Sequence, residues 1–142
     1  MGLSSIKASQ TLVLDSNILI TAFNNPQSAS GKLLESIKEI GPRVFISTLV
    51  FEEFLVRVYK KKLEKDIASY ENFIVGGGAF IVVNVDRKIA RRAAQIRANY
   101  SSIRAPDAIH LATAIESKAK IFVTCDKRLP KKIEKLSIEI LS

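Results

Sequence analysis

The chain has 142 residues, 47% of them hydrophobic and 25% charged, which is typical of a globular protein and excludes a disordered chain. A single cysteine, Cys125, excludes an internal disulfide, and no apolar stretch resembles a signal peptide or approaches the ~20 residues of a membrane span. The formal net charge of +8 favours a polyanionic partner such as RNA or DNA. We therefore expect a cytoplasmic protein with a single domain over residues 1–142, whose residues 1–10 are an N-terminal leader.

The first half of the chain alternates short runs rich in β-branched residues with longer segments of helical character. Asn24-Asn25-Pro26 is a turn signal between two of these helical segments, and Gly41-Pro42 precedes a strand. In chain order the expected elements are a strand at Thr11–Leu14, helices at Asn17–Phe23 and Ser30–Glu39, a strand at Arg43–Ile46, and helices at Leu49–Leu63 and Glu64–Ile74.

The second half continues this alternation after Gly76-Gly77-Gly78, which lacks the Gly-Lys-Ser/Thr spacing of a phosphate-binding loop and predicts a flexible turn. In chain order the expected elements are a strand at Ala79–Val83, a helix that follows the N-cap Asp86 and ends near Tyr100, a helix from Pro106 to Lys118, and strands at Ile121–Thr124 and Ile138–Ile140. The first of these strands is apolar on both faces, which is typical of a strand buried within a parallel sheet. The alternation predicts an α/β fold with a mostly parallel sheet of four or five strands.

Two aspartates follow expected strands and should lie at the same edge of the sheet. Asp15 follows Thr11–Leu14 directly, and Asp126 follows Ile121–Thr124 with only Cys125 between them. Sites in open α/β sheets form at the carboxyl ends of the strands. We therefore expect Asp15 and Asp126 to lie near each other.

Two further acidic positions reach this edge by other routes. The helix that begins at Pro106 covers about 18 Å, and the strand after it returns roughly 16 Å. Asp107 should therefore end near the first two aspartates. Glu53 lies about one turn past the start of the helix at Leu49–Leu63, again beside this edge. Its neighbour Glu52 competes for the role, and the apolar pattern of the helix does not separate the two.

A cluster of four carboxylates predicts a metal site. Like charges raise one another's pKa, and a divalent cation relieves that repulsion. Carboxylate and water oxygens suit Mg²⁺ and Mn²⁺. Taken singly, an Asp after a strand is commonly a turn or cap residue, and Asp126 would serve equally as the cap of a last helix. The convergence of four acidic positions in a basic chain instead favours a metal-dependent enzyme that acts on nucleic acid.

Four segments of the chain, in order, resemble the motifs of the PIN-domain nucleases, most of all the VapC-type ribonucleases of toxin–antitoxin pairs. The segments are Val13-Leu14-Asp15-Ser16-Asn17-Ile18-Leu19, Ile46-Ser47-Thr48-Leu49-Val50-Phe51-Glu52-Glu53-Phe54-Leu55, Pro106-Asp107-Ala108-Ile109-His110-Leu111-Ala112-Thr113-Ala114 and Phe122-Val123-Thr124-Cys125-Asp126. The family places the glutamate of its second motif six positions after a serine, here Ser47, which selects Glu53 over Glu52. The resemblance runs from about Leu12 to the C-terminus.

This resemblance implies a PIN-like three-layer α/β/α sandwich and a metal-dependent endoribonuclease, the toxin of a type II toxin–antitoxin pair. It implies that the catalytic residues, which are also the ligands of Mg²⁺ or Mn²⁺, are Asp15, Glu53, Asp107 and Asp126. It also implies RNA as the substrate, an antitoxin as a protein partner, and a homodimer. In the mechanism that this implies, a water molecule acidified by the metal attacks the phosphodiester. Cleavage then yields a 5′-phosphate and a 3′-hydroxyl.

Several residues near the four carboxylates have expected supporting roles. Asn17 and Thr124 each lie two residues from an aspartate and are expected to orient carboxylates or substrate, although Thr124 is equally explained as a strand-end residue. His110 is expected to pack among apolar neighbours rather than act as a base, because the sequence shows no partner for it. Cys125 is expected to be a small buried residue.

Basic residues are expected to contact the RNA backbone without reading its sequence. Arg87 and Arg91 lie four residues apart and form a stripe on one expected helix, and Lys60 lies near the end of the helix at Leu49–Leu63. Arg104 comes shortly before the third motif and should therefore lie near the acidic site. The alternative for each is a solvated helix face or, for Lys60, a favourable helix C-terminus.

Two other classes of protein compete with a PIN nuclease. A non-catalytic PIN-like domain that binds nucleic acid as a scaffold needs no metal ligands, and the presence of all four acidic residues argues against it. A haloacid-dehalogenase-like phosphatase also opens with an aspartate after a strand. That family requires Asp-x-Asp, however, and Asn17 stands where the second aspartate would be.

Overall fold

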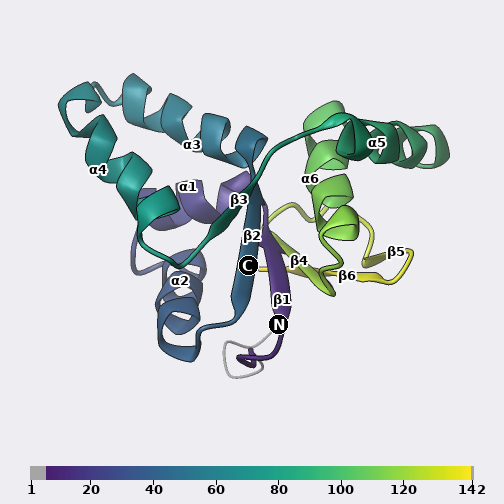
Figure 1. The fold of residues 1–142 in the computed structure, drawn as a ribbon, viewed down its shortest axis with the longest axis horizontal. Helices are drawn as coiled ribbons and strands as arrows, with labels where there is room; N and C mark the ends of the chain where they lie inside the picture. The colour runs from purple at the N-terminus through teal and green to yellow at the C-terminus, as the bar shows by residue number, and fades with distance from the viewer. Residues whose placement is uncertain (1–5, 142) are drawn as a thin grey trace.

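The computed structural model describes residues 6–141, which form one sheet between two layers of helices (Figure 1). Residues 1–5 of the expected leader and residue 142 lie outside the described residues. The sheet has six strands in the order β3-β2-β1-β4-β6-β5, and every neighbouring pair is parallel except β5 with β6. The strands are β1 (Thr11–Leu14), β2 (Arg43–Ser47), β3 (Ile81–Val83), β4 (Ile121–Thr124), β5 (Lys132–Ile133) and β6 (Leu136–Ile140).

Helices cover both faces of the sheet: α1 to α4 lie on one face, and α5 and α6 on the other (Figure 1). A 3₁₀ turn at Glu64–Asp66 precedes α4, and a π-helical turn at Asn72–Gly76 follows it. The helices are α1 (Ser16–Asn24), α2 (Ala29–Ile40), α3 (Thr48–Lys60), α4 (Ile67–Glu71), α5 (Arg87–Asn99) and α6 (Ala105–Glu116). This arrangement confirms the predicted three-layer α/β/α sandwich, but the sheet has six strands rather than the predicted four or five, because the chain after Asp126 adds the short strand β5. Among residues 6–141, no helix has the length and apolar run needed to cross a bilayer.

The central strand β1 contributes to both halves of the core, because successive side chains of a strand point to opposite faces of the sheet. Leu12 and Leu14 pack in the half that contains α1, α2 and α3, whereas Val13 packs in the half that contains α5 and α6. All three side chains are almost fully buried. Packing from both sides therefore fixes the end of β1, where Asp15 follows.

The strand β3 lies at one edge of the sheet, which corrects the prediction of a strand buried within it. It pairs with β2 alone, and 46% of the surface of Ile81 is exposed. An apolar run shows that a strand can be buried on two faces, but it does not say whether another strand pairs with its free edge.

The chain after Asp126 forms a β-hairpin rather than the last helix that Asp126 would have capped. Strands β5 and β6 are antiparallel, with Ile133 opposite Leu136. Glu134, in the turn between them, has a φ of 53°, a left-handed conformation that side chains other than glycine rarely adopt. No glycine or asparagine marks this turn, so the usual sequence signal of a tight hairpin is missing.

Gly31 lies where the start of α2 meets the turn that follows α1, and no space is left for a side chain. A Cβ atom at this position would lie 2.0 Å from the carbonyl oxygen of Pro26. Because this obstacle is backbone, the turn itself would have to shift. We expect Gly31→Ala to lower the free energy of unfolding by about 2 kcal/mol, measured by urea denaturation.

The matched control is Gly76→Ala, because a Cβ atom at Gly76 would lie 3.6 Å from the nearest atom of Asn72, an ordinary contact. This variant should unfold at nearly the wild-type urea concentration. Equal stability of the two variants would show that the turn at Pro26 adapts at little cost.

Candidate active site

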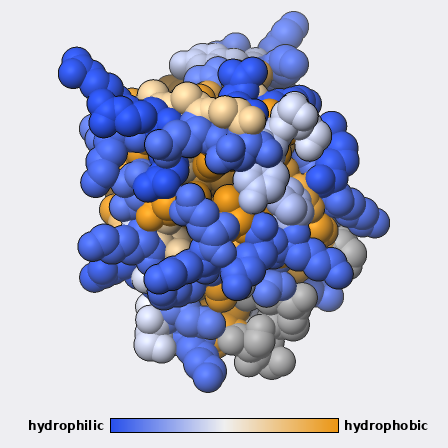
Figure 2. Space-filling view, turned by 90° about the vertical axis from the view of Figure 1, so that its right-hand side faces the viewer, coloured by the Kyte–Doolittle hydropathy of each residue, from blue (hydrophilic) through white to orange (hydrophobic). Residues whose placement is uncertain are grey.

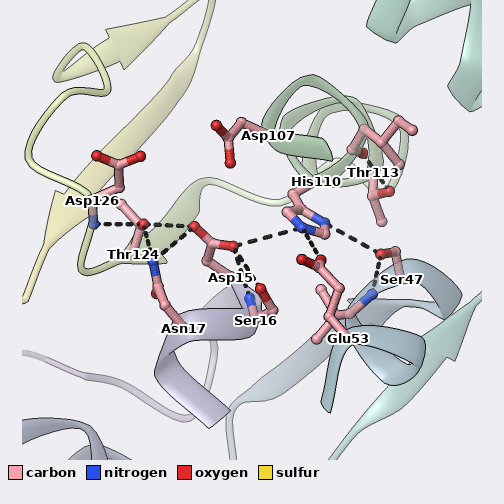
Figure 3. A network of polar contacts seen from close by, with 12 residues as sticks. Asp15, Ser16, Asn17, Ser47, Glu53, Asp107, His110, Thr113, Thr124 and Asp126 are labelled. Carbon is pink, nitrogen blue, oxygen red and sulfur yellow. Dashed lines mark hydrogen bonds and ion pairs between the residues drawn. The ribbon is translucent and has the colours of Figure 1, made fainter. Parts of the chain in front are cut away.

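The four predicted carboxylates line one cavity beside the carboxyl ends of the parallel strands. Asp15 follows β1, Glu53 lies in the second turn of α3, Asp107 lies in the first turn of α6, and Asp126 closely follows β4. The cavity has a volume of about 580 Å³. Figure 3 shows the four carboxyl groups around a common space, with the imidazole of His110 between Asp15 and Glu53.

Asp15 is the most deeply buried of the four, with 3% of its surface exposed. It is the N-cap of α1, because its Oδ1 accepts a hydrogen bond from the Ser16 amide at 2.8 Å. Its Oδ2 accepts from the Thr124 hydroxyl at 2.7 Å and from Asn17 Nδ2 at 3.3 Å. Burial raises the pKa of Asp15, and the hydrogen bonds and nearby His110 offset this only in part. The ionised carboxylate is therefore held at a cost that a bound cation would offset.

Asn17 and Thr124 connect α1 to the end of β4. Asn17 Nδ2 lies 3.3 Å from Thr124 Oγ1, and Asn17 Oδ1 accepts from the backbone amide of Cys125 at 3.1 Å. Thr124 Oγ1 also accepts from the backbone amide of Asp126 at 3.0 Å. The Thr124 hydroxyl thus touches the side chain of Asp15 and the backbone of Asp126. This geometry is what an orienting role requires, and the role itself stays a prediction.

His110 is buried, as expected, but it also has carboxylate partners that the sequence did not reveal. Its Nε2 lies 2.9 Å from Glu53 Oε1 and 3.7 Å from Asp15 Oδ1. Its Nδ1 lies 3.5 Å from Ser47 Oγ, which caps α3 by accepting from the Val50 amide at 3.1 Å. Ser47 and His110 therefore fix both the start of α3 and the side chain of Glu53 that α3 carries.

Asp126 and Asp107 each pair with an arginine that also lines the cavity. Arg128 Nε and Nη2 donate to Oδ1 and Oδ2 of Asp126, both at 2.9 Å, and the Arg128 amide donates to Oδ1 at 2.9 Å. These contacts with Arg128 hold the pKa of Asp126 below its usual value. Arg104 Nε donates to Asp107 Oδ2 at 3.3 Å. Arg104 lies near the site, as predicted from the sequence, whereas the contact of Arg128 with Asp126 was not predicted.

The chemistry of this donor set fits a hard divalent cation, because four carboxylates line one cavity and one of them is buried with a raised pKa. Between residues 6 and 141, however, no three His, Cys, Asp or Glu side chains converge closely enough to hold an ion as they stand. Three of the carboxylates are bonded to a histidine or an arginine. An ion would therefore have to replace these partners.

A family model described as the PIN domain matches residues 12–135. The chain belongs to the PIN-domain family. The matched segment contains all four carboxylates and the three arginines that line the cavity of this PIN domain. A comparison with curated proteins gave no match.

Solved structures of toxin–antitoxin proteins are similar to this PIN domain. A toxin–antitoxin complex from Klebsiella pneumoniae is 26% identical with a TM-score of 0.66, over 82% of this chain and 88% of the other. VapBC2 from Rickettsia felis, bound to a DNA fragment from its promoter, is 22% identical with a TM-score of 0.72, over 94% and 100%. VapC20 of Mycobacterium tuberculosis, a toxin that cleaves the sarcin-ricin loop, is 12% identical with a TM-score of 0.63, over 78% and 86%. These similarities confirm the predicted VapC-like fold.

The basic residues predicted to bind RNA lie in two places on this PIN domain. Arg104 lines the acidic cavity together with Arg128. Arg87 and Arg91 are exposed on α5, and Lys60 is exposed at the end of α3; none of these three lines the cavity. Figure 2 shows that hydrophilic residues cover most of the face on the α5 side, with hydrophobic residues visible between them. The α5 stripe is therefore accessible but separate from the carboxylates.

Proposed function

We propose that this protein is a metal-dependent endoribonuclease and the toxin of a type II toxin–antitoxin pair. The observation that carries the proposal is the cavity itself, where carboxylates from four separate segments lie beside three arginines, Arg57, Arg104 and Arg128. The PIN-domain family supports a nuclease. RNA as the substrate is supported by the similar fold of VapC20, a toxin that cleaves the sarcin-ricin loop.

In this proposal Asp15, Glu53, Asp107 and Asp126 hold Mg²⁺ or Mn²⁺. The chemistry that either ion supplies is the acidification of a water molecule and the neutralisation of charge on the phosphate. The donors around Asp15 keep its carboxylate in one orientation, because they hold both of its oxygens. Arg104, at the rim, contacts the phosphodiester backbone, and cleavage leaves a 5′-phosphate and a 3′-hydroxyl.

We further propose an antitoxin as a protein partner and a second copy of the chain as a dimer partner. The antitoxin is supported by the similar structures, which are described as toxin–antitoxin complexes. It is also supported by an apolar cavity of about 490 Å³ between α1, α2, α3 and α4. The apolar side chains that line this cavity include Leu19, Phe23, Leu34, Phe54, Tyr70 and Phe73. Such a lining favours apolar side chains of a partner over a polar nucleic acid.

The experiment that tests the nuclease is cleavage of total RNA with Mg²⁺ or Mn²⁺, compared with EDTA. We expect cleavage with either ion and none with EDTA. Glu53→Gln should lower the rate by roughly 10³-fold, as expected when a ligand of a catalytic metal is lost. Cleavage in EDTA would contradict metal dependence, and a folded protein that cuts no RNA with either ion would favour the non-catalytic scaffold.

Glu52→Gln is the matched control, because it removes the same charge from the neighbouring position of α3. Glu52 is exposed and lies outside the cavity lining, whereas Glu53 lines the cavity. We expect Glu52→Gln to cleave at nearly the wild-type rate. If Glu52→Gln cleaves RNA much more slowly than Glu53→Gln, the metal ligand is Glu52 rather than Glu53.

A further inference from the structure

Two arginines at the cavity rim contact carboxylates that the proposed nuclease needs for its metal. Arg128 uses two nitrogen atoms of its guanidinium group on both oxygens of Asp126, and Arg104 uses one on Asp107. Both arginine side chains remain largely exposed, Arg128 at 68% and Arg104 at 63%. These contacts thus bring two positively charged groups to the acidic site while leaving most of each side chain in solvent.

Both pairs have an arginine that is mostly exposed, so water can replace the guanidinium group when a divalent cation takes the carboxylate. Ion pairs with an exposed partner contribute little to stability, because water screens them and long side chains lose rotamer freedom. Asp15 differs from Asp126 and Asp107, since its oxygens are held by the Ser16 amide, the Thr124 hydroxyl and the Asn17 amide rather than by an arginine. Asp15 is therefore a fixed member of the site, and the other two aspartates have partners that can leave.

Asp126 cannot bind a divalent cation through its carboxylate while both oxygens keep their hydrogen bonds to Arg128. Both oxygens of Asp126 already accept from Arg128, and Oδ1 accepts from the Arg128 amide as well. A guanidinium group that loses this carboxylate keeps a planar pair of donors, which matches the oxygens of a phosphate. Arg128 lies only two residues from Asp126, so a released side chain stays within reach of the cavity mouth.

We propose that Arg128 and Arg104 compete with a divalent cation for Asp126 and Asp107, and that the displaced guanidinium groups bind the phosphodiester backbone of the substrate. This inference rests on the proposed function. It makes the two arginines part of an exchange: loading of the metal frees the groups that hold the RNA. RNA affinity should therefore depend on metal through these arginines, in addition to any direct contact between metal and phosphate.

The decisive variant is Arg128→Lys, which keeps the positive charge but loses the two-point contact with Asp126. Calorimetric titration of the metal-free protein with Mn²⁺, without RNA, should show binding a few-fold tighter than wild type, because a lysine with a single-point contact competes less well for Asp126 than the two-point arginine. If only the net charge near the site mattered, Arg128→Lys would bind Mn²⁺ as wild type does. Arg104→Gln provides an independent arm and should also tighten Mn²⁺ binding.

Replacing Arg128 should weaken the binding of RNA, although it should tighten the binding of Mn²⁺. With saturating Mn²⁺, Arg128→Gln should raise the KM for RNA several-fold, with a smaller change in kcat. Without metal, RNA binding measured by fluorescence anisotropy should be nearly the same for Arg128→Gln and wild type. Arg97→Gln, which removes the same charge from exposed α5 outside the cavity, should leave Mn²⁺ affinity unchanged.

Wild-type Mn²⁺ affinity in Arg128→Lys and Arg104→Gln, in proteins that cleave RNA, would overturn the exchange and leave the nuclease intact. An equal loss of RNA affinity for Arg128→Gln with and without metal would also overturn it. Failure of the wild-type protein to bind Mn²⁺ or to cleave RNA would instead remove the proposed function, and this inference with it.

Discussion

Replacing Asp15 by Asn should nearly abolish RNA cleavage and, at the same time, make the metal-free protein more stable at neutral pH. A metal ion contributes several kcal/mol of charge stabilisation in the transition state, so loss of a fixed ligand should lower kcat by roughly 10³-fold. The fold should survive, because Asn is as good an N-cap as Asp at the start of α1. Cleavage of RNA and thermal unfolding, measured on the same preparations, test the two effects together.

The gain in stability follows from the pKa of Asp15, which burial raises above its ordinary value of 3.8. A carboxyl group that binds its proton more tightly in the folded state than in the unfolded state lowers stability as the pH rises above the unfolded pKa, and the full cost is present above the folded pKa. Below the unfolded pKa both states are protonated, and this cost disappears. Asp15→Asn should therefore raise the melting temperature by a few degrees at neutral pH, and the difference should vanish as the pH falls below 3.8.

With Mn²⁺ added, the wild-type protein should have a higher melting temperature than Asp15→Asn, the reverse of the order expected without metal. A ligand that binds only the folded state raises its melting temperature, so the wild type should gain and Asp15→Asn should gain much less. A variant that melts below wild type without metal at neutral pH would show that the Asp15 carboxylate stabilises the fold. Cleavage at the wild-type rate would remove Asp15 from the active site.

The positions of Asp15 and Asp126 could be predicted because each depends on one local rule. Apolar β-branched runs mark β1 and β4, and the carboxyl ends of parallel strands meet at one edge of the sheet. The predicted boundaries of both strands agree with the structure. The position of Asp107 could be predicted because α6 and β4 have similar lengths, so the start of the helix lies near the end of the strand. Local sequence patterns combined with strand direction were sufficient for these positions.

Contacts between side chains that lie far apart along the chain could not be predicted from the sequence. His110 lies 57 residues from Glu53 along the chain, and nothing in either motif shows that their side chains meet. The available signal was weak: His110 lies three residues after Asp107 and so shares its face of α6. Arg128 was visible next to Asp126, but a basic residue after an aspartate is common in turns. Its two-point contact depends on the loop that replaces the expected last helix.

The same limit explains the errors in the sheet. The apolar run that forms β3 packs against the helical layers, so its composition resembles that of a central strand. Its edge position depends on which strands lie beside β2, and only β1 and β3 do. The hairpin of β5 and β6 turns at Glu134 in a left-handed conformation without glycine. Sheet order and this turn are fixed by tertiary packing rather than by local propensity.

Removing only the hydroxyl of Thr124 should damage both the fold and the active site. Thr124→Val keeps the shape of the buried side chain, but it leaves Asp15 Oδ2 without its 2.7 Å donor and the Asp126 amide without its 3.0 Å acceptor. Asn17 still donates to Asp15 Oδ2 at 3.3 Å, but the loss of the two Thr124 hydrogen bonds at this buried position should lower the free energy of unfolding by about 2 kcal/mol. Cleavage should fall by about 10- to 100-fold, because the two aspartates lose a group that orients them.

Thr124→Ser is the matched control, since it keeps the hydroxyl and loses only a methyl group. It should recover most of the cleavage and of the Mn²⁺ affinity, although the small cavity left by the methyl group will cost some stability. Mn²⁺ titration separates the two explanations of this residue. If Thr124 serves only as a strand-end residue that favours β structure, both variants will bind Mn²⁺ as wild type does. If its hydroxyl orients the site, Mn²⁺ binding will weaken in Thr124→Val alone.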